Sequence, residues 1–191
     1  MNELQFGATL ARAQNGEQHA LSVIWRAHNP YLLRYLRTRH PARDVEDVAA
    51  ETWLRVSRSL RRFEGNESDF KAWFFTIARA ASADWHRNAA RRPDLVLGGD
   101  PEHHEASRDG NPETEAMAAF GTTHAIALLR ELPAEQSEAI ALRVIAGLDT
   151  DRVAEIMDKR PGTVRVLQHR GLRRLAEMLA PDQSVQSDVT R

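Results

Sequence analysis

Cationic side chains gather on one short segment near the C-terminus of this chain. Between Lys159 and Ala176 there are six lysines and arginines and no acid. Arg165, His169 and Arg173 recur every four residues, so a helix would place them on one face. Apolar residues at helical spacing would form another face, and they are Val164, Leu167, Gly171, Leu172, Leu175 and Leu179. A helix with one basic and one apolar face suits the major groove of DNA.

The residues before this segment predict the rest of a helix-turn-helix. Thr150 can cap a first helix, and Pro161 suits the first position of a second helix, where its missing N–H would have no partner. The plain alternative is a solvated, arginine-rich helix face. Such a face tends to carry acidic partners four residues away, which we expect to be lacking here. We therefore interpret residues 147–175 as a DNA-binding helix-turn-helix.

Composition limits what the rest of the chain can be. The 191 residues are 42% hydrophobic, which is enough for one large or two small domains, and the net charge is −1. With so little net charge, any affinity for nucleic acid must come from local patches. The chain has no cysteine, so disulfides and cysteine-ligated zinc are excluded. Met1–Leu10 lacks a signal pattern and no apolar run could span a bilayer, so we expect a cytoplasmic protein without membrane insertion.

Helical periodicity dominates the first half, and no strand pattern is convincing. The expected elements are helices over Leu21–Arg39, Asp44–Leu60 and Phe70–Asn88, with a polar loop over Phe63–Ser68. Asn29-Pro30 should kink or break the first helix, and Asp44 should cap the second. In the aromatic third helix we expect Phe74, Ile77 and Ala78 to be buried, and Trp73 to lie nearest any bound DNA.

The composition changes after the third helix. Asp94–Met117 holds seven acids and one arginine, which favours a flexible linker, and helical patterning resumes at Phe120. Leu132-Pro133 precedes a helix over Ala134–Ala146 that is apolar nearly all round. The predicted fold is all-α: a helical domain over 16–92, an acidic linker over 93–119 and a helix-turn-helix domain over 120–180. The tail from 181 to 191 should fray.

A small cluster in the linker raises a metal-site or hydrolase interpretation. It comprises Glu102, His103, His104 and Glu105. Adjacent histidines point apart and match no helix-based ligand pair, so we favour a chance polar cluster. No phosphate loop or nucleophile elbow supports an enzyme. We therefore expect no metal, no cofactor and no catalytic activity.

Three motifs in order resemble those of the extracytoplasmic-function (ECF) sigma factors of bacterial RNA polymerase. Asp44–Val56 resembles the acidic helix that sigma factors press against the polymerase clamp helices. Phe70–Arg79, followed by Asp84-Trp85-His86-Arg87, is similar to the helix that contacts the −10 promoter element. The terminal helix-turn-helix, with Gly162-Thr163-Val164-Arg165, resembles the reader of the −35 element. The resemblance spans residues 16–180 and implies a promoter-recognition subunit.

The resemblance assigns residues to three tasks. Those expected to bind polymerase are Asp44, Asp47, Glu51 and Leu54. Those expected at the −10 DNA are Phe63, Gly65, Asn66, Trp73, Arg79, Arg87 and Arg91. Those expected at the −35 DNA are Arg160, Gly162, Thr163, Arg165, Val166, His169, Arg170 and Arg173. The implied partners are core RNA polymerase, promoter DNA and an anti-sigma factor.

The chain also departs from the family pattern. Ala50 stands where many members have Gln, Ala80 where Asn is common, and Val166-Leu167 where Ser-Arg is frequent. Val166 could instead contact a thymine methyl group. A competing hypothesis is an independent, dimeric helix-turn-helix regulator with an N-terminal sensor domain. Selective capture of core polymerase would separate the two hypotheses.

Overall fold

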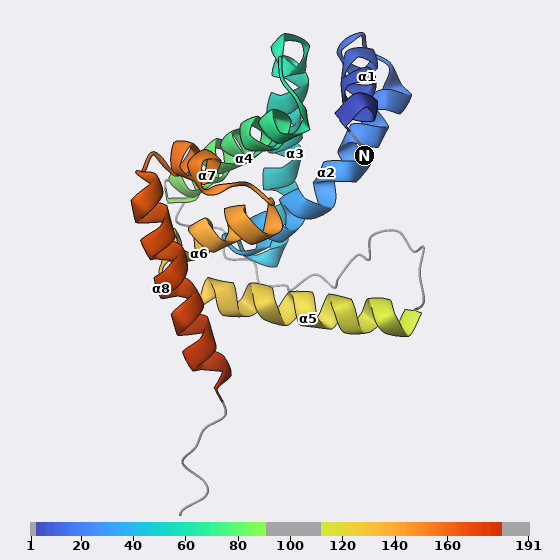
Figure 1. The fold of residues 1–191 in the computed structure, drawn as a ribbon. Helices are drawn as coiled ribbons and strands as arrows, with labels where there is room; N and C mark the ends of the chain where they lie inside the picture. Colours follow the sequence, from blue (N-terminus) through green and yellow to red (C-terminus); the bar gives the residue numbers. More distant parts are fainter. Residues whose placement is uncertain (1–2, 91–111, 181–191) are drawn as a thin grey trace, which may run out of the picture.

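A computed structural model describes residues 3–90 and 112–180, and every regular element in these ranges is helical (Figure 1). The tail 181–191, Arg91 and the cluster around His103 and His104 lie outside the described residues. Within the described ranges, no helix is long and apolar enough to cross a membrane. The same ranges hold no group of three or more side chains that could ligate a metal ion.

The N-terminal domain is built from four α-helices and one 3₁₀ turn. They are α1 (Glu3–Gln14), α2 (Gln18–Arg37), α3 (Ala42–Ser59), η1 (Leu60–Arg62) and α4 (Glu67–Ala90). The pairs α1–α2, α2–α3 and α3–α4 each pack together. Their buried stripes follow helical spacing, as Val45, Val48, Thr52 and Val56 do on α3. The predicted helices are thereby confirmed, with small changes at their ends.

Two local expectations in this domain differ from the structure. Pro30 does not break α2, because Ile24, Leu32 and Leu36 on both sides of it are buried and hold the helix in place. Asp44 is not the cap of α3. Pro41 is the N-cap, and the backbone N–H of Asp44 already donates to the Pro41 carbonyl at 3.0 Å, so Asp44 lies in the first turn. An acid there still interacts favourably with the helix dipole.

Helix α1 was not predicted. Its apolar residues Phe6, Leu10 and Ala13 are buried at helical spacing, and this spacing is the signal that could have found it. The Phe6 ring lies 5.4 Å from that of Phe70 and 6.5 Å from that of His28, measured between centroids. Helix α1 therefore contributes to the packed core of this domain.

The C-terminal domain follows a similar plan. Its elements are α5 (Pro112–Arg130), α6 (Ala134–Ile140), η2 (Ala141–Ile145), α7 (Thr150–Met157) and α8 (Pro161–Leu179). Helix α5 begins at Pro112, inside the stretch expected to be linker. The single helix expected over 134–146 becomes α6 followed by η2, a π-helical segment. The backbone N–H of Ala146 bonds to the Ala141 carbonyl, five residues back, at 3.1 Å.

Helices α7 and α8 form the predicted helix-turn-helix. Asp149, rather than Thr150, is the N-cap of α7, because its side chain accepts a hydrogen bond of 2.8 Å from the backbone N–H of Arg152. The turn closes on Asp158, whose φ of 53° puts it in the left-handed region. Pro161 takes the first position of α8, as predicted.

The two domains pack against each other. One contiguous cluster of buried apolar side chains runs from Phe6 and Phe70 in the N-terminal domain to Leu142 and Val153 in the C-terminal domain. Helix α7 lies against α4, and η2 lies against α2 (Figure 1). We call this packing of α7 against α4 and of η2 against α2 the closed arrangement.

Candidate nucleic-acid interface and acidic groove

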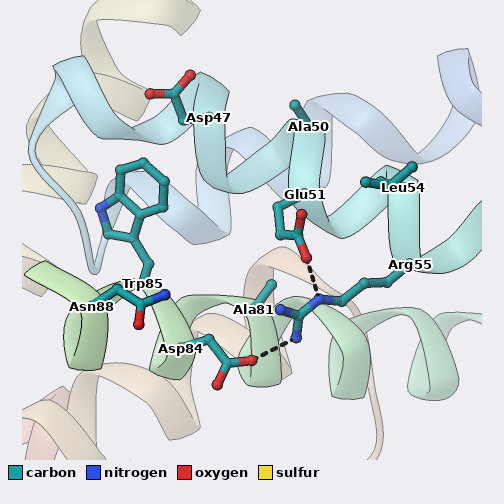
Figure 2. A pocket seen from close by; sticks show the side chains of 9 residues that line it. All are labelled: Asp47, Ala50, Glu51, Leu54, Arg55, Ala81, Asp84, Trp85 and Asn88. Carbon is teal, nitrogen blue, oxygen red and sulfur yellow. Dashed lines mark hydrogen bonds and ion pairs between the residues drawn. The ribbon is translucent and has the colours of Figure 1, made fainter.

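A shallow groove runs between α3 and α4 (Figure 2). Its lining residues are Asp47, Ala50, Glu51, Leu54, Arg55, Ala81, Asp84, Trp85 and Asn88. Three of the four residues expected to bind polymerase, Asp47, Glu51 and Leu54, therefore lie together. Asp44 does not line the groove, and its Oδ1 lies 3.6 Å from Arg43 Nε.

Arg55 bridges the two walls of this acidic groove. Its Nε lies 2.7 Å from Glu51 Oε1 on α3, and its Nη1 lies 2.8 Å from Asp84 Oδ2 on α4 (Figure 2). The hydrogen bond from Arg55 lowers the pKa of Asp84. Glu51 is thus partly neutralised, whereas Asp47 has no ion pair within the described part of the chain. Asp47 is the carboxylate most available to a cationic partner.

Part of the lining of the acidic groove is apolar and exposed. Leu54 is 44% exposed, and Ala50 beside it is exposed too. Exposed leucine flanked by carboxylates fits a partner helix that carries both apolar and basic side chains. Arg55, Asp84 and Trp85 were not among the expected site residues. Only the packing of α4 onto α3 brings them to the groove.

The loop before α4 is fixed by a reciprocal cap. The Asn66 backbone N–H donates to Asp69 Oδ2 at 3.1 Å, and the Asp69 N–H donates to Asn66 Oδ1 at 3.0 Å. Gly65 has a φ of 145°, and a Cβ there would lie only 2.7 Å from Asp69 Cβ. Gly65 and Asn66 therefore shape the loop, and the side-chain oxygen of Asn66 is already engaged.

The aromatic side chains beside this loop are mostly core. Phe74 and Ala78 are buried as expected, but Ile77 is only half-buried, so its predicted burial is wrong. Ile77 lies at the border of the buried stripe, a distinction that periodicity alone does not make. Trp73 is half-buried, with its ring centroid 4.9 Å from that of Phe63 and 5.5 Å from that of Phe70.

The arginines of α4 have partners within the chain. Arg79 donates from Nε to Glu138 Oε1 at 3.0 Å, across the domain boundary. Arg87 pairs with Asp84. Two of the cations expected at −10 DNA are thus neutralised in the closed arrangement. Glu138 was missed, because the sequence does not show which of the two acids of α6, Glu135 or Glu138, is buried.

Helix α8 presents the cationic face that its sequence predicts. The exposed residues expected at DNA are Arg160, Gly162, Thr163, Arg165, Val166, His169, Arg170 and Arg173. Val166 is 48% exposed, whereas Val164, two residues earlier, is fully buried. One expectation fails: Arg173 has an acidic partner, with its Nε 3.0 Å from Glu177 Oε1. Glu177 directly follows the acid-free segment that ends at Ala176.

A close helix contact sets the position of α8. Gly171 is buried against α6, where an added Cβ would lie 2.7 Å from Ile140 Cδ1 and 3.2 Å from Gln136 Cβ. No larger side chain fits without displacing a neighbour. The glycine therefore lets α8 approach α6 while its basic face stays in solvent.

Comparisons with known proteins match both halves of the chain. Residues 24–92 match the model of Sigma-70 region 2, and residues 125–175 match that of Sigma-70 region 4. The chain is 34% identical to the ECF RNA polymerase sigma factor SigD of Mycobacterium tuberculosis, covering 89% of this chain and 82% of SigD. It is 35% identical to the ECF sigma factor ShbA of Streptomyces griseus, covering 88% and 92%. It is 31% identical to the ECF sigma factor BldN of Streptomyces coelicolor, covering 90% of this chain but only 64% of BldN.

Solved structures share the fold. The structure of CnrH in complex with the cytosolic domain of CnrY has a TM-score of 0.62 at 20% identity, covering 90% of this chain and 95% of that one. The sigma factor RpoE in complex with the anti-sigma factor NepR from Bartonella quintana has a TM-score of 0.63 at 22% identity, covering 85% and 98%.

Proposed function

Because this chain belongs to the ECF sigma factors, which direct promoter recognition by RNA polymerase and are not enzymes, we propose how its residues divide that task. The N-terminal domain, expected over residues 16–92, binds core polymerase and the −10 element, and the C-terminal domain, expected over residues 120–180, binds the −35 element. This division is supported by two surfaces of opposite charge on the one chain. They are the acidic groove between α3 and α4, and the exposed basic face of α8.

The acidic groove is the polymerase-binding surface. Asp47 supplies a carboxylate without an ion pair in the described part of the chain, and Leu54 supplies an exposed apolar contact. Glu51 contributes through its pair with Arg55, which holds the carboxylate in place. Ala50, where many family members have Gln, leaves this contact apolar. Asp44 lies outside the groove and adds long-range attraction at most.

The loop before α4 and the start of that helix face the melted −10 strand. Phe63 and Trp73 form the aromatic edge on which an unpaired base can stack, while Gly65 and Asn66 fix the loop beside it. Arg79 and Arg87 supply cations along the same helix, and Arg91, which follows in the sequence, is the third cation that we assign to this task. Ala80 is exposed and offers no polar group to a base.

The N-terminal turns of α8 read the −35 duplex. Thr163, Arg165, Val166 and His169 lie in the part of a recognition helix that meets base edges. Arg160, Gly162, Arg170 and Arg173 lie where phosphates run. Arg165 can form two hydrogen bonds to one guanine, and Val166 can contact a thymine methyl.

An anti-sigma factor is the regulatory partner that we propose. The support is the family itself and the structure of RpoE, a relative in fold, in complex with NepR. Since core polymerase and promoter DNA are cytoplasmic, we place the working protein in the cytoplasm.

Capture of core polymerase tests the assignment of the acidic groove. Asp47→Arg should reduce capture at least tenfold, because inverting one partner of a desolvated charge pair costs about 2 kcal/mol or more. Glu46→Arg is the matched control, since Glu46 is exposed on the same helix but does not line the groove. Equal capture by both variants would refute the assignment.

Run-off transcription tests the function as a whole. Core polymerase supplied with this chain and a library of promoter sequences should initiate on a defined subset, and core alone should not. Binding of the chain to duplex DNA as a dimer, without capture of core, would instead support an independent regulator.

A further inference from the structure

One carboxylate of the C-terminal domain is buried in the N-terminal domain. Glu138 on α6 is 5% exposed. Its Oε1 accepts a hydrogen bond from Tyr35 Oη at 3.3 Å and lies 3.1 Å from Arg39 Nη1 and 3.0 Å from Arg79 Nε. Tyr35 and Arg39 belong to the C-terminal end of α2 and its following turn, and Arg79 belongs to α4. Three donors from one domain thus converge on one oxygen from the other.

Two of these donors also have contacts inside the N-terminal domain. Arg39 Nε lies 3.3 Å from Ser82 Oγ, and its guanidinium stands 5.8 Å above the centroid of the Tyr35 ring. Tyr35 is fully buried in the closed arrangement, with its ring centroid 5.3 Å from that of Phe75 on α4. Two guanidinium groups face a single carboxylate, which leaves an excess positive charge. Guanidinium groups bind carboxylate and phosphate oxygens through the same geometry.

The proposed function requires this contact to open. Elements at −10 and −35 lie about 25 base pairs apart, or about 85 Å at about 3.4 Å per base pair. A compact chain of 191 residues has a radius of gyration of only about 16 Å. The closed arrangement therefore cannot reach both elements at once. When the domains separate on promoter DNA, Glu138 leaves, and Tyr35, Arg39 and Arg79 are exposed together.

We propose that Tyr35, Arg39 and Arg79 form a binding site for a backbone phosphate of promoter DNA, and that Glu138 occupies this site as an internal competitor while the chain is closed. The proposal rests on the assignment of α4 to the −10 region. A second ion pair, between Asp69 on α4 and Arg152 on α7, closes the same interface nearer the loop. Helix α6 thus carries a carboxylate where DNA would carry a phosphate.

Fluorescence anisotropy with a labelled single-stranded oligonucleotide of mixed sequence tests the competition on the full chain. Glu138→Gln should bind more tightly than the parent, by about tenfold if the parent is open in about one chain in ten. Glu135→Gln is the matched control, because Glu135 lies on the same helix but pairs with Lys159 of its own domain. If Glu138→Gln binds no more tightly than Glu135→Gln, Glu138 is not a competitor and the proposal is wrong.

Adding Arg39→Gln separates a phosphate site from a simple lock. If Arg39 only holds the domains together, Glu138→Gln with Arg39→Gln should bind as tightly as Glu138→Gln alone. If Arg39 binds a phosphate, the double variant should bind more weakly than Glu138→Gln alone. The slope of the logarithm of its binding constant against the logarithm of the salt concentration should also become less steep by about 0.7, the value for one phosphate contact on a single strand. Equal affinities and equal slopes would overturn the phosphate assignment.

A crosslink provides a test that does not depend on the folding of Glu138→Gln. The chain has no cysteine, so Asp69→Cys with Arg152→Cys introduces two unique thiols whose side chains meet in the closed arrangement. Joining them with a short thiol–thiol crosslinker should lower oligonucleotide affinity below that of the unjoined double variant. Unchanged affinity would overturn the proposal. Run-off transcription by the parent, measured in parallel, reports on the proposed function independently.

Discussion

Gly171 offers a direct test of how α8 is held against α6. Replacing a helix-interior glycine with alanine normally stabilises a helix by about 1 kcal/mol. At Gly171, however, the new Cβ would lie 2.7 Å from Ile140 Cδ1 and 3.2 Å from Gln136 Cβ. Ile140 is 3% exposed and has little room to rotate away, and the Cβ of Gln136 moves only with its backbone.

The opposing effects can be compared in magnitude. Overpacking a tight contact costs about 1–3 kcal/mol. After the gain in helix propensity, Gly171→Ala should therefore lower the free energy of unfolding by up to about 2 kcal/mol. Gly121→Ala is the matched control, because Gly121 is also helical but has nothing within 4 Å of its added Cβ. It should gain the propensity term alone, so the two variants should differ by about 1–3 kcal/mol.

Thermal unfolding followed by far-UV circular dichroism measures this difference. Each kcal/mol shifts the midpoint by about 2–4 °C in a chain of this size. Gly171→Ala should melt below Gly121→Ala, and the parent should melt between the two variants or level with Gly171→Ala. If Gly171→Ala were stabilised as much as Gly121→Ala, the close approach of α8 to α6 would not constrain the domain, and the reasoning would fail.

Three further predictions address DNA binding and pH. Arg165→Ala should reduce the free energy of binding to the preferred −35 duplex by about 1–3 kcal/mol and relax the preference at one or two base pairs. Arg173→Ala should weaken binding to all duplexes alike and by less, because Arg173 is already paired with Glu177. Equal losses of affinity on every duplex for Arg165→Ala would show that Arg165 contacts only the DNA backbone. Trp73→Ala should impair promoter opening while sparing closed complexes, and a pre-melted bubble template should restore transcription by this variant. If the variant instead loses thermal stability and the bubble template does not restore transcription, Trp73 belongs to the core that it shares with Phe63. Burial lowers the pKa of His28 and of His40 from 6.5 to about 4, so as the pH drops from 6.5 towards 4 the unfolded chain binds protons before the folded chain does, and the free energy of unfolding should fall. His28→Leu should make the melting midpoint depend less steeply on pH between 6.5 and 4, and an unchanged slope would contradict the role of His28.

The sequence by itself determined the elements that depend on near neighbours. Helical periodicity of 3.6 residues places Val45, Val48 and Val56 on one stripe, and it predicts α2, α3, α4, α7 and α8 without reference to the rest of the chain. Pro161 begins α8 because its fixed φ and its missing N–H suit the first turn of a helix. The order and chemistry of the motifs also indicated the family, and both matched models confirm it.

Local chemistry was less decisive where two neighbouring residues could serve one role. Asp149 and Thr150 are both good caps, and the structure selects Asp149 through its bond to the Arg152 N–H. The break expected at Pro30 failed for a different reason: burial of α2 on both sides outweighs one missing hydrogen bond. Such choices depend on packing energies that a local pattern does not contain.

Only the tertiary structure decided which charges meet. Arg55 reaches Asp84 across 29 positions of sequence, and Arg79 reaches Glu138 across 59, so neither pair follows from helical spacing. Side chains so far apart in sequence come together only when whole helices are oriented against one another, and that orientation is set by the apolar core that both domains share. From the sequence, Arg79 is a cation suited to binding DNA. In the folded chain its side chain is paired with the Glu138 carboxylate.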